Sequence, residues 1–251
     1  MKPIKIIALL GLVLVSTTYS QKLEVNFSKL AWGYNYAGLR VDPGIFNEKI
    51  PTMANVDSLG SWMNLNGIGG WISVNDRWRV GAIGMFGNIL ASGQSDEIDN
   101  LFRQVDLNIK FAGPTLESIF RPFKGVEFTI GGMVGFGDVG LQLYQKDGNL
   151  TWDAMWEEYT DEYEAENAVD TTSYIAKARL IDMHAKTLVI YPWVGFRIPD
   201  FLGVLTIGVE AGGLIGTVSE ENWRIPFGKV ANAKSFDLTN PIVRMTVYFG
   251  N

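Results

Sequence analysis

The stretch Phe236–Asn251, FDLTNPIVRMTVYFGN, alternates between apolar and polar residues with a period of two, the period of a β-strand. One face of such a strand carries only apolar residues: Pro241, Val243, Met245, Val247 and Phe249. The opposite face carries Ile242, Arg244, Thr246 and Tyr248. A continuous apolar face with an arginine opposite it requires surroundings that are apolar on one side and polar on the other.

Earlier segments have similar patterns, and we expect eight strands in all. Their ranges are 28–41, 60–74, 77–90, 102–112, 126–143, 187–198, 204–218 and 237–249. Residues 113–125, bracketed by Pro114 and Pro122, are expected to be a connection with one helical turn. The alternation slips at Gly137 and Asp138, as it does at a β-bulge. A further strand pair within 173–183 would raise the number to ten.

The N-terminus has the three-part layout of a secretory signal peptide. Two lysines precede an apolar stretch, Ile6–Val15, and small residues follow up to Ser20. This stretch is too short to span a membrane as a helix. We expect residues 1–20 to be a signal peptide and residues 21–251 to form a single β-barrel domain.

The composition limits the class of protein. The chain has no cysteine and a net charge of -6, so it has neither disulfides nor a basic surface for nucleic acid. Hydrophobic residues make up 47%, with 8 Trp, 9 Tyr, 14 Phe and 28 Gly. Apolar content of this kind, spread in alternation, is what a lipid-facing β-barrel requires, although a soluble β-sandwich could share it.

The connections between the expected strands alternate between short and long. If the first strand runs outward, the short connections at 75–76 and 199–203 lie on the periplasmic side. The long connections at 42–59, 144–186 and 219–236 then lie outside the cell. The longest of them, at about 144–186, is rich in acidic residues.

The signal peptide, the aromatic-rich alternating strands and the near-terminal Phe249 resemble those of small bacterial outer-membrane β-barrels. The resemblance covers the whole mature chain but rests on architecture and includes no specific motif. Proteins of this kind typically end on the aromatic residue, whereas Gly250 and Asn251 follow it here. The resemblance implies a closed antiparallel transmembrane barrel of the outer membrane, with membrane lipid as its surroundings.

In such a barrel the apolar faces point outward and charged residues point inward. The interior is then expected to hold three acids and three bases in a paired network: Asp106, Lys110, Glu127, Arg197, Glu210 and Arg244. An eight-stranded barrel has room for its own side chains or for one small ligand, so we expect no open aqueous channel.

Motifs for catalysis are weak. Residues 135–140 match G-x-G-x-x-G, but the match lies within an expected strand and lacks the helix that a dinucleotide site needs. His184 is the sole histidine, and no G-x-S-x-G motif accompanies it. We expect no catalytic residues, no cofactor and no metal site. The aromatic residues of the acidic loop are a candidate contact surface: Trp152, Trp156, Tyr159 and Tyr163.

We therefore expect a non-enzymatic outer-membrane barrel with a structural or surface-interaction role, its outer loops contacting a surface partner. A second hypothesis is a conduit or binder for small hydrophobic molecules that uses the barrel mouth and the aromatic residues of the first strand. A third is a soluble secreted lipocalin-like barrel, in which the apolar faces would point inward.

Overall fold

The computed structural model describes residues 29–50, 56–94, 101–147, 178–226 and 228–250. The expected signal peptide lies outside these ranges, as does the centre of the acidic loop, with Trp152, Trp156, Tyr159 and Tyr163. In the described part of the chain, no helix is long and apolar enough to cross a membrane.

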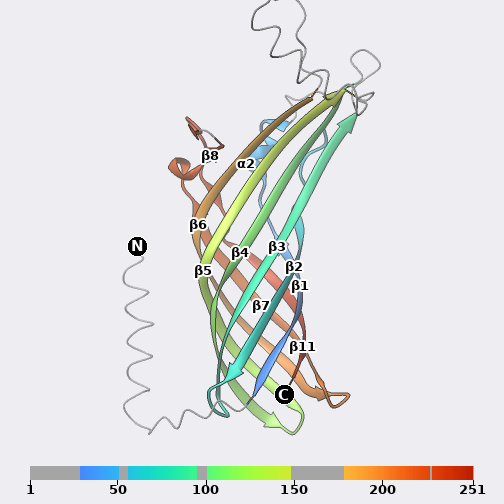
Figure 1. Ribbon diagram of the computed structural model, residues 1–251, viewed down its shortest axis with the longest axis vertical. Coiled ribbons are helices and arrows are strands. Elements are labelled where there is room, and N and C mark those ends of the chain that lie inside the picture. The colour runs from blue at the N-terminus through green and yellow to red at the C-terminus, as the bar shows by residue number, and fades with distance from the viewer. Residues whose placement is uncertain (1–28, 51–55, 95–100, 148–177, 227, 251) are drawn as a thin grey trace, which may run out of the picture.

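Eight antiparallel strands form a closed ring (Figure 1). They are β1 (Leu30–Arg40), β2 (Trp62–Ser73), β3 (Trp78–Gln94), β4 (Leu101–Phe123), β5 (Val126–Asp147), β6 (Ala178–Phe201), β7 (Leu205–Val218) and β11 (Asn240–Phe249). The terminal strand closes the ring between β7 and β1, with Phe249 in register with Trp32. The predicted eight-stranded barrel is confirmed, and residues 178–183 belong to β6, so they add no strand to the ring.

Short elements gather at the end of the barrel that carries the long connections. They are α2 (Gly44–Asn47), η2 (Glu220–Asn222), β8 (Arg224–Ile225), β9 (Gly228–Lys229) and β10 (Phe236–Asp237). β8 pairs with β6, and β10 pairs with the end of β7. The opposite end has tight turns, such as the one that joins β4 to β5. In an outer-membrane barrel the tight turns face the periplasm, so the end with the long connections is the extracellular mouth.

The barrel wall is tall on one side and short on the other (Figure 1). β1, β2 and β11 have 11, 12 and 10 residues, about the length that one membrane crossing requires. β4, β5 and β6 have 23, 22 and 24 residues, and their upper halves extend beyond the short strands. This upper part forms a curved sheet above the level of the membrane.

The expected connection at 113–125 is wrong, because β4 continues through it to Phe123. Pro114 pairs with Ala82 of β3, and its missing N–H coincides with a gap in the ladder between β4 and β5. The turn to β5 falls at Gly125, whose φ of 83° suits glycine. The β4–β5 connection is thus a short periplasmic turn, and no helical turn lies there.

The expected bulge at Gly137 and Asp138 is also wrong, because β5 stays in register with β4 and β6 at both residues. Instead, the environment of the two faces of β5 changes at this point. Phe136 is 77% exposed on the outer wall, whereas Val139 is buried inside the barrel. Below this level the outer face is apolar, and above it the inner face is apolar.

The lower outer wall carries a belt of exposed apolar side chains. They include Trp32, Ile68, Phe86, Phe120, Ile130, Phe136, Leu188, Val194, Val243 and Met245. Exposed apolar surface that runs around a closed ring of strands suits lipid and not water. Apolar side chains such as Ile83 and Met133 also point inward at this level, but the outer face is not the polar surface expected for a soluble lipocalin-like barrel.

Candidate binding pocket and charged interior

Four of the six charged residues expected inside the barrel lie there. Glu127, Arg197, Glu210 and Arg244 are all at most 2% exposed. The prediction is wrong for Asp106 and Lys110, which lie on the outer face of the upper part of β4. At that height the wall faces water, so the apolar residues of β4 turn inward and its polar residues turn outward.

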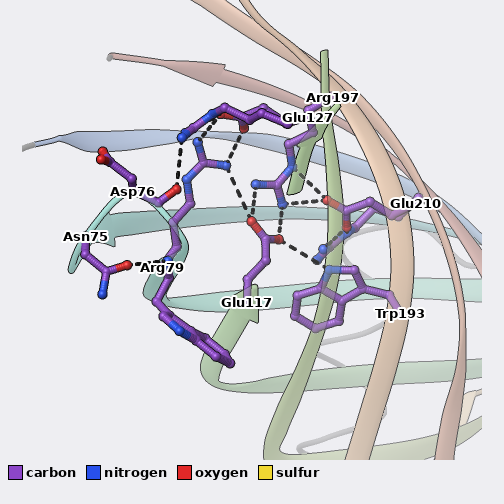
Figure 2. Close-up of polar contacts among 11 residues, drawn as sticks. Asn75, Asp76, Arg79, Glu117, Glu127, Trp193, Arg197 and Glu210 are labelled. Carbon is purple, nitrogen blue, oxygen red and sulfur yellow. Dashed lines mark hydrogen bonds and ion pairs between the residues drawn. The ribbon is translucent and has the colours of Figure 1, made fainter. Parts of the chain in front are cut away.

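Arg197 lies at the centre of the interior network (Figure 2). Its two terminal nitrogens donate to the Glu117 carboxylate at 2.7 and 2.6 Å. Its Nε and Nη2 donate to Oε1 of Glu210 at 3.0 and 2.6 Å. Arg244 donates through Nε and Nη2 to the other oxygen of Glu210, with Nε at 2.7 Å. Each carboxylate is thereby shared between cations, which offsets the cost of removing these charges from water.

A second part of the network lies nearer the periplasmic turns. Arg79 donates to Glu127 at 3.0 Å and contacts Glu117 at 3.5 Å, so it joins the two parts. Arg121 donates to Glu127 at 2.9 and 2.7 Å and is the more exposed end of the network. Arg79, Glu117 and Arg121 are not among the interior residues predicted from the sequence. Glu117 and Arg121 fall in the expected connection 113–125, and Arg79 lies between Trp78 and Val80 in an alternation that could have revealed it.

Aromatic side chains fill the space around these charges. The guanidinium carbon of Arg79 lies 3.8 Å from the Trp71 ring centre, and that of Arg244 lies 4.8 Å from the Trp193 ring centre. The indole N–H of Trp193 is 3.4 Å from Glu117. Gly131 faces Trp193 across the ladder, and a Cβ there would lie 2.6 Å from the indole ring. Glycine is required at that position because the indole occupies the space.

The charged layer closes the barrel to water at this level. A cavity of about 20 Å³ is found beside the network, which is room for about one water molecule. Hydrogen-bonded side chains occupy the remaining space, as the narrow diameter of an eight-stranded ring requires. The arrangement fits the expectation of a plugged interior.

Above the charged layer, the mouth contains an apolar pocket of about 270 Å³. It lies between the inner face of the tall wall and the loops that follow β1 and β7. Apolar side chains make up most of its lining: Ile45, Phe46, Ile50, Val105, Leu141, Leu143, Met183, Trp223, Val230 and Ala233. Lys49, Asn232 and Lys234 are the other described residues that line it.

The loops over the pocket are packed against one another. Phe46 meets Trp223 edge to face, with ring centres 6.0 Å apart, and lies 5.2 Å from Phe236. The indole of Trp223 is 3% exposed, and its N–H donates to the Lys234 carbonyl at 2.9 Å. The Asn47 side chain ties the first loop together by donating to and accepting from the Leu59 backbone at 3.1 and 2.8 Å. The loops thus form a cap, which we call the mouth cap (residues 43–50, 219–226 and 228–238).

Two other sequence-based candidates are placed away from this pocket. The aromatic side chains of the first strand, Trp32, Tyr34 and Tyr36, are exposed on the outer wall, so they do not line it. His184 lies on the outer face of β6, in a cleft whose described lining residues include neither a serine nor a carboxylate. Among the described residues, no group of three or more His, Cys, Asp or Glu is placed to hold a metal ion. The G-x-G-x-x-G match lies inside β5, which continues as a strand to Asp147.

No protein-family model matches the chain, and no curated protein matches it. Among solved structures, it is similar to the outer membrane protein OprG from Pseudomonas aeruginosa. The identity is 9% over 89% of this chain and 95% of OprG, with a TM-score of 0.45. It is also similar to Ail, the attachment invasion locus protein of Yersinia pestis, solved in complex with the heparin analogue sucrose octasulfate. That match has 10% identity, covers 88% of this chain and 95% of Ail, and has a TM-score of 0.34.

At these identities and TM-scores, the likeness concerns the fold alone. The closed ring and the apolar outer belt of this chain are themselves those of an outer-membrane β-barrel. The resemblance predicted from the sequence is thus confirmed for the architecture.

Proposed function

We propose that this protein resides in the bacterial outer membrane and binds small apolar molecules, without enzymatic activity, in the pocket at its extracellular mouth. The observation that carries this proposal is the lining of that pocket, whose described residues are apolar except for Lys49, Asn232 and Lys234. Burial of an apolar ligand there removes its surface from water, which contributes about 25 cal/mol for each Å².

The pocket volume limits the size of the ligand. A volume of about 270 Å³ is slightly below the usual range for drug-sized ligands. We expect a compact apolar molecule or a short hydrocarbon chain.

The charged layer beneath the pocket favours a binder over a conduit. Arg197 and its partners fill the ring below the pocket, so a ligand held in the mouth has no open path to the periplasm through them. The surface-interaction role predicted from the acidic loop stays a prediction, because the aromatic residues on which it depends lie outside the described residues.

Binding of the apolar fluorescent probe N-phenyl-1-naphthylamine to the purified barrel in dodecyl maltoside tests the proposal. Ala233→Trp would fill the pocket, and we expect it to weaken probe binding at least tenfold. Val243→Trp adds the same side chain to the lipid-facing wall and serves as the matched control. Equal binding by the two variants, after subtraction of the signal from protein-free micelles, would place the probe outside the pocket and reject the proposal.

A further inference from the structure

A polar cleft of about 310 Å³ lies on the outer wall of the barrel, separate from the mouth pocket. It is lined by His184, Lys186, Asn222 and Arg224. His184 and Lys186 lie on the outer face of β6, since Ala185 between them is fully buried on the inner face. Every one of the four side chains can donate a hydrogen bond, and none of the described residues that line the cleft is a carboxylate.

Two contacts hold β6 and the segment around β8 together at the cleft. β8 pairs with β6 at Arg224 and His184, which places the two side chains next to each other. The Asn222 side chain donates to the Lys186 carbonyl at 3.1 Å and fixes the segment before β8. Figure 1 shows β8 beside the upper part of β6. The donors therefore come from two elements that are tied together.

The cations of the cleft have capacity for a ligand. Nη1 of Arg224 donates to the carbonyls of Glu221 and Trp223, the latter at 3.0 Å. These bonds use one of the three guanidinium nitrogens. Asp138 is the acid that the β5–β6 register places opposite Lys186. Within the described part of the chain, neither Lys186 nor Arg224 forms an ion pair with a carboxylate.

The cleft lies where the apolar belt ends. Leu188, two residues below Lys186 on the same face of β6, is 50% exposed, and its register partner Phe136 is 77% exposed. One step up the ladder, Lys186 faces Asp138, and Asp138 faces Lys110. This change from apolar to charged marks the boundary between lipid chains and headgroups on the extracellular side.

We propose that this cleft binds the phosphate group of a lipid in the outer leaflet. A phosphate is an anionic acceptor that suits a lysine, an arginine and two neutral donors gathered at one point. The acyl chains of such a lipid lie against the apolar belt directly below the cleft. The lipid therefore reaches both surfaces at once, which a free phosphate ion does not. This inference is independent of the mouth pocket.

Native mass spectrometry of the full chain in dodecyl maltoside tests the proposal. The probes are dioleoyl phosphatidic acid, dioleoylglycerol with the same chains but no phosphate, and inorganic phosphate. We expect the wild-type protein to bind phosphatidic acid at least tenfold more tightly than dioleoylglycerol. The K186Q/R224Q double variant should lose this preference, and Lys186→Arg should keep it because the charge is kept.

Lys110→Gln is the matched control, because Lys110 lies at the same level of the wall but outside the cleft. It should bind phosphatidic acid like the wild type. A similar loss in Lys110→Gln would mean general charge attraction and would overturn the site. Binding of inorganic phosphate as tight as that of the lipid would overturn the choice of ligand. Each variant is first checked for slower or faster migration of its unboiled form in SDS gels, which shows that the barrel is folded.

Discussion

Inside the ring, the size of single residues decides whether large charged side chains fit into a narrow barrel. Arg197 contacts two carboxylates at once, and both partners lie within hydrogen-bonding distance. A space that holds these large side chains exists because small residues face them: at Gly208, an added Cβ would lie 2.5 Å from the Cγ of Arg197. A glycine on one strand thus leaves the room that an arginine side chain on the neighbouring strand occupies.

Replacement of Arg197 by leucine should destabilise the folded barrel strongly, because Glu117 and Glu210 would lose a shared partner while they stay buried. We expect a loss of about 3–5 kcal/mol in the free energy of unfolding, measured by urea titration of the barrel in detergent. Arg121→Leu is the comparison: the Arg121 side chain is 40% exposed, so its loss should cost about 1 kcal/mol or less. Equal effects of the two substitutions would contradict a buried network centred on Arg197.

At the scale of elements, the upper halves of β4, β5 and β6 act as the wall of a small domain that stands above the membrane. Their inner face is apolar, and the mouth cap supplies the other half of its core through Phe46, Trp223 and Phe236. The apolar core continues down the barrel to Trp193 beside the charged layer, whereas Phe46, Trp223 and Phe236 of the cap pack at its upper end, outside the ring of eight strands. The cap should therefore loosen without the ring opening.

Trp223→Ala tests that separation. Removal of a large buried aromatic side chain from a core costs about 3–5 kcal/mol, and here the loss should fall on the cap. We expect trypsin to cleave at Lys229 and Lys234 faster, while the unboiled protein still migrates in SDS gels as a folded barrel. Trp62→Ala, at an exposed position on the outer wall, should leave the cleavage rate unchanged. Loss of the folded band in Trp223→Ala would show that cap and ring unfold together.

At the scale of the whole molecule, the outer wall divides into a lower apolar belt and an upper polar band. The division follows the ladder across strands: Phe136 and Leu188 face lipid, and Asp138 and Lys186 follow one step higher. The tall wall therefore passes from lipid into water. Along one strand, the exposed apolar residues lie on the outer face below this boundary, and the apolar residues lie on the inner face above it.

A charge placed on each side of this division should have different effects. Ile130→Arg puts a cation into the belt, where it should cost about 2–4 kcal/mol of folding free energy near the middle of the bilayer. Asn108→Arg puts the same side chain on the outer face of β4, two residues above Lys110, where water solvates it, and should change stability little. The measurement is unfolding of the two variants in urea from vesicles of defined lipid. An equal cost would place the boundary elsewhere.

The sequence by itself located all eight strands, although it left open a further pair within 173–183 and made β4 and β6 too short. The strands predicted from alternation for β1, β2, β3, β7 and β11 matched the structure closely. Each face of these strands keeps the same surroundings along most of its length, so the alternation is regular. It did not reveal that β4 runs through Pro114, since a proline is tolerated where the ladder has a gap that depends on the neighbouring strand. Glu117 was therefore missed as a partner of Arg197.

The tertiary structure alone decided which face of each strand looks inward. A period of two separates two faces but carries no information on which one meets lipid, water or the barrel interior. For Arg244 the choice of the interior was correct, because the terminal strand lies within the membrane level. For Asp106 and Lys110 it was wrong, because β4 has risen above that level and water surrounds its outer face. The height of a residue in the wall comes from strand register and barrel closure, which join segments far apart in the chain.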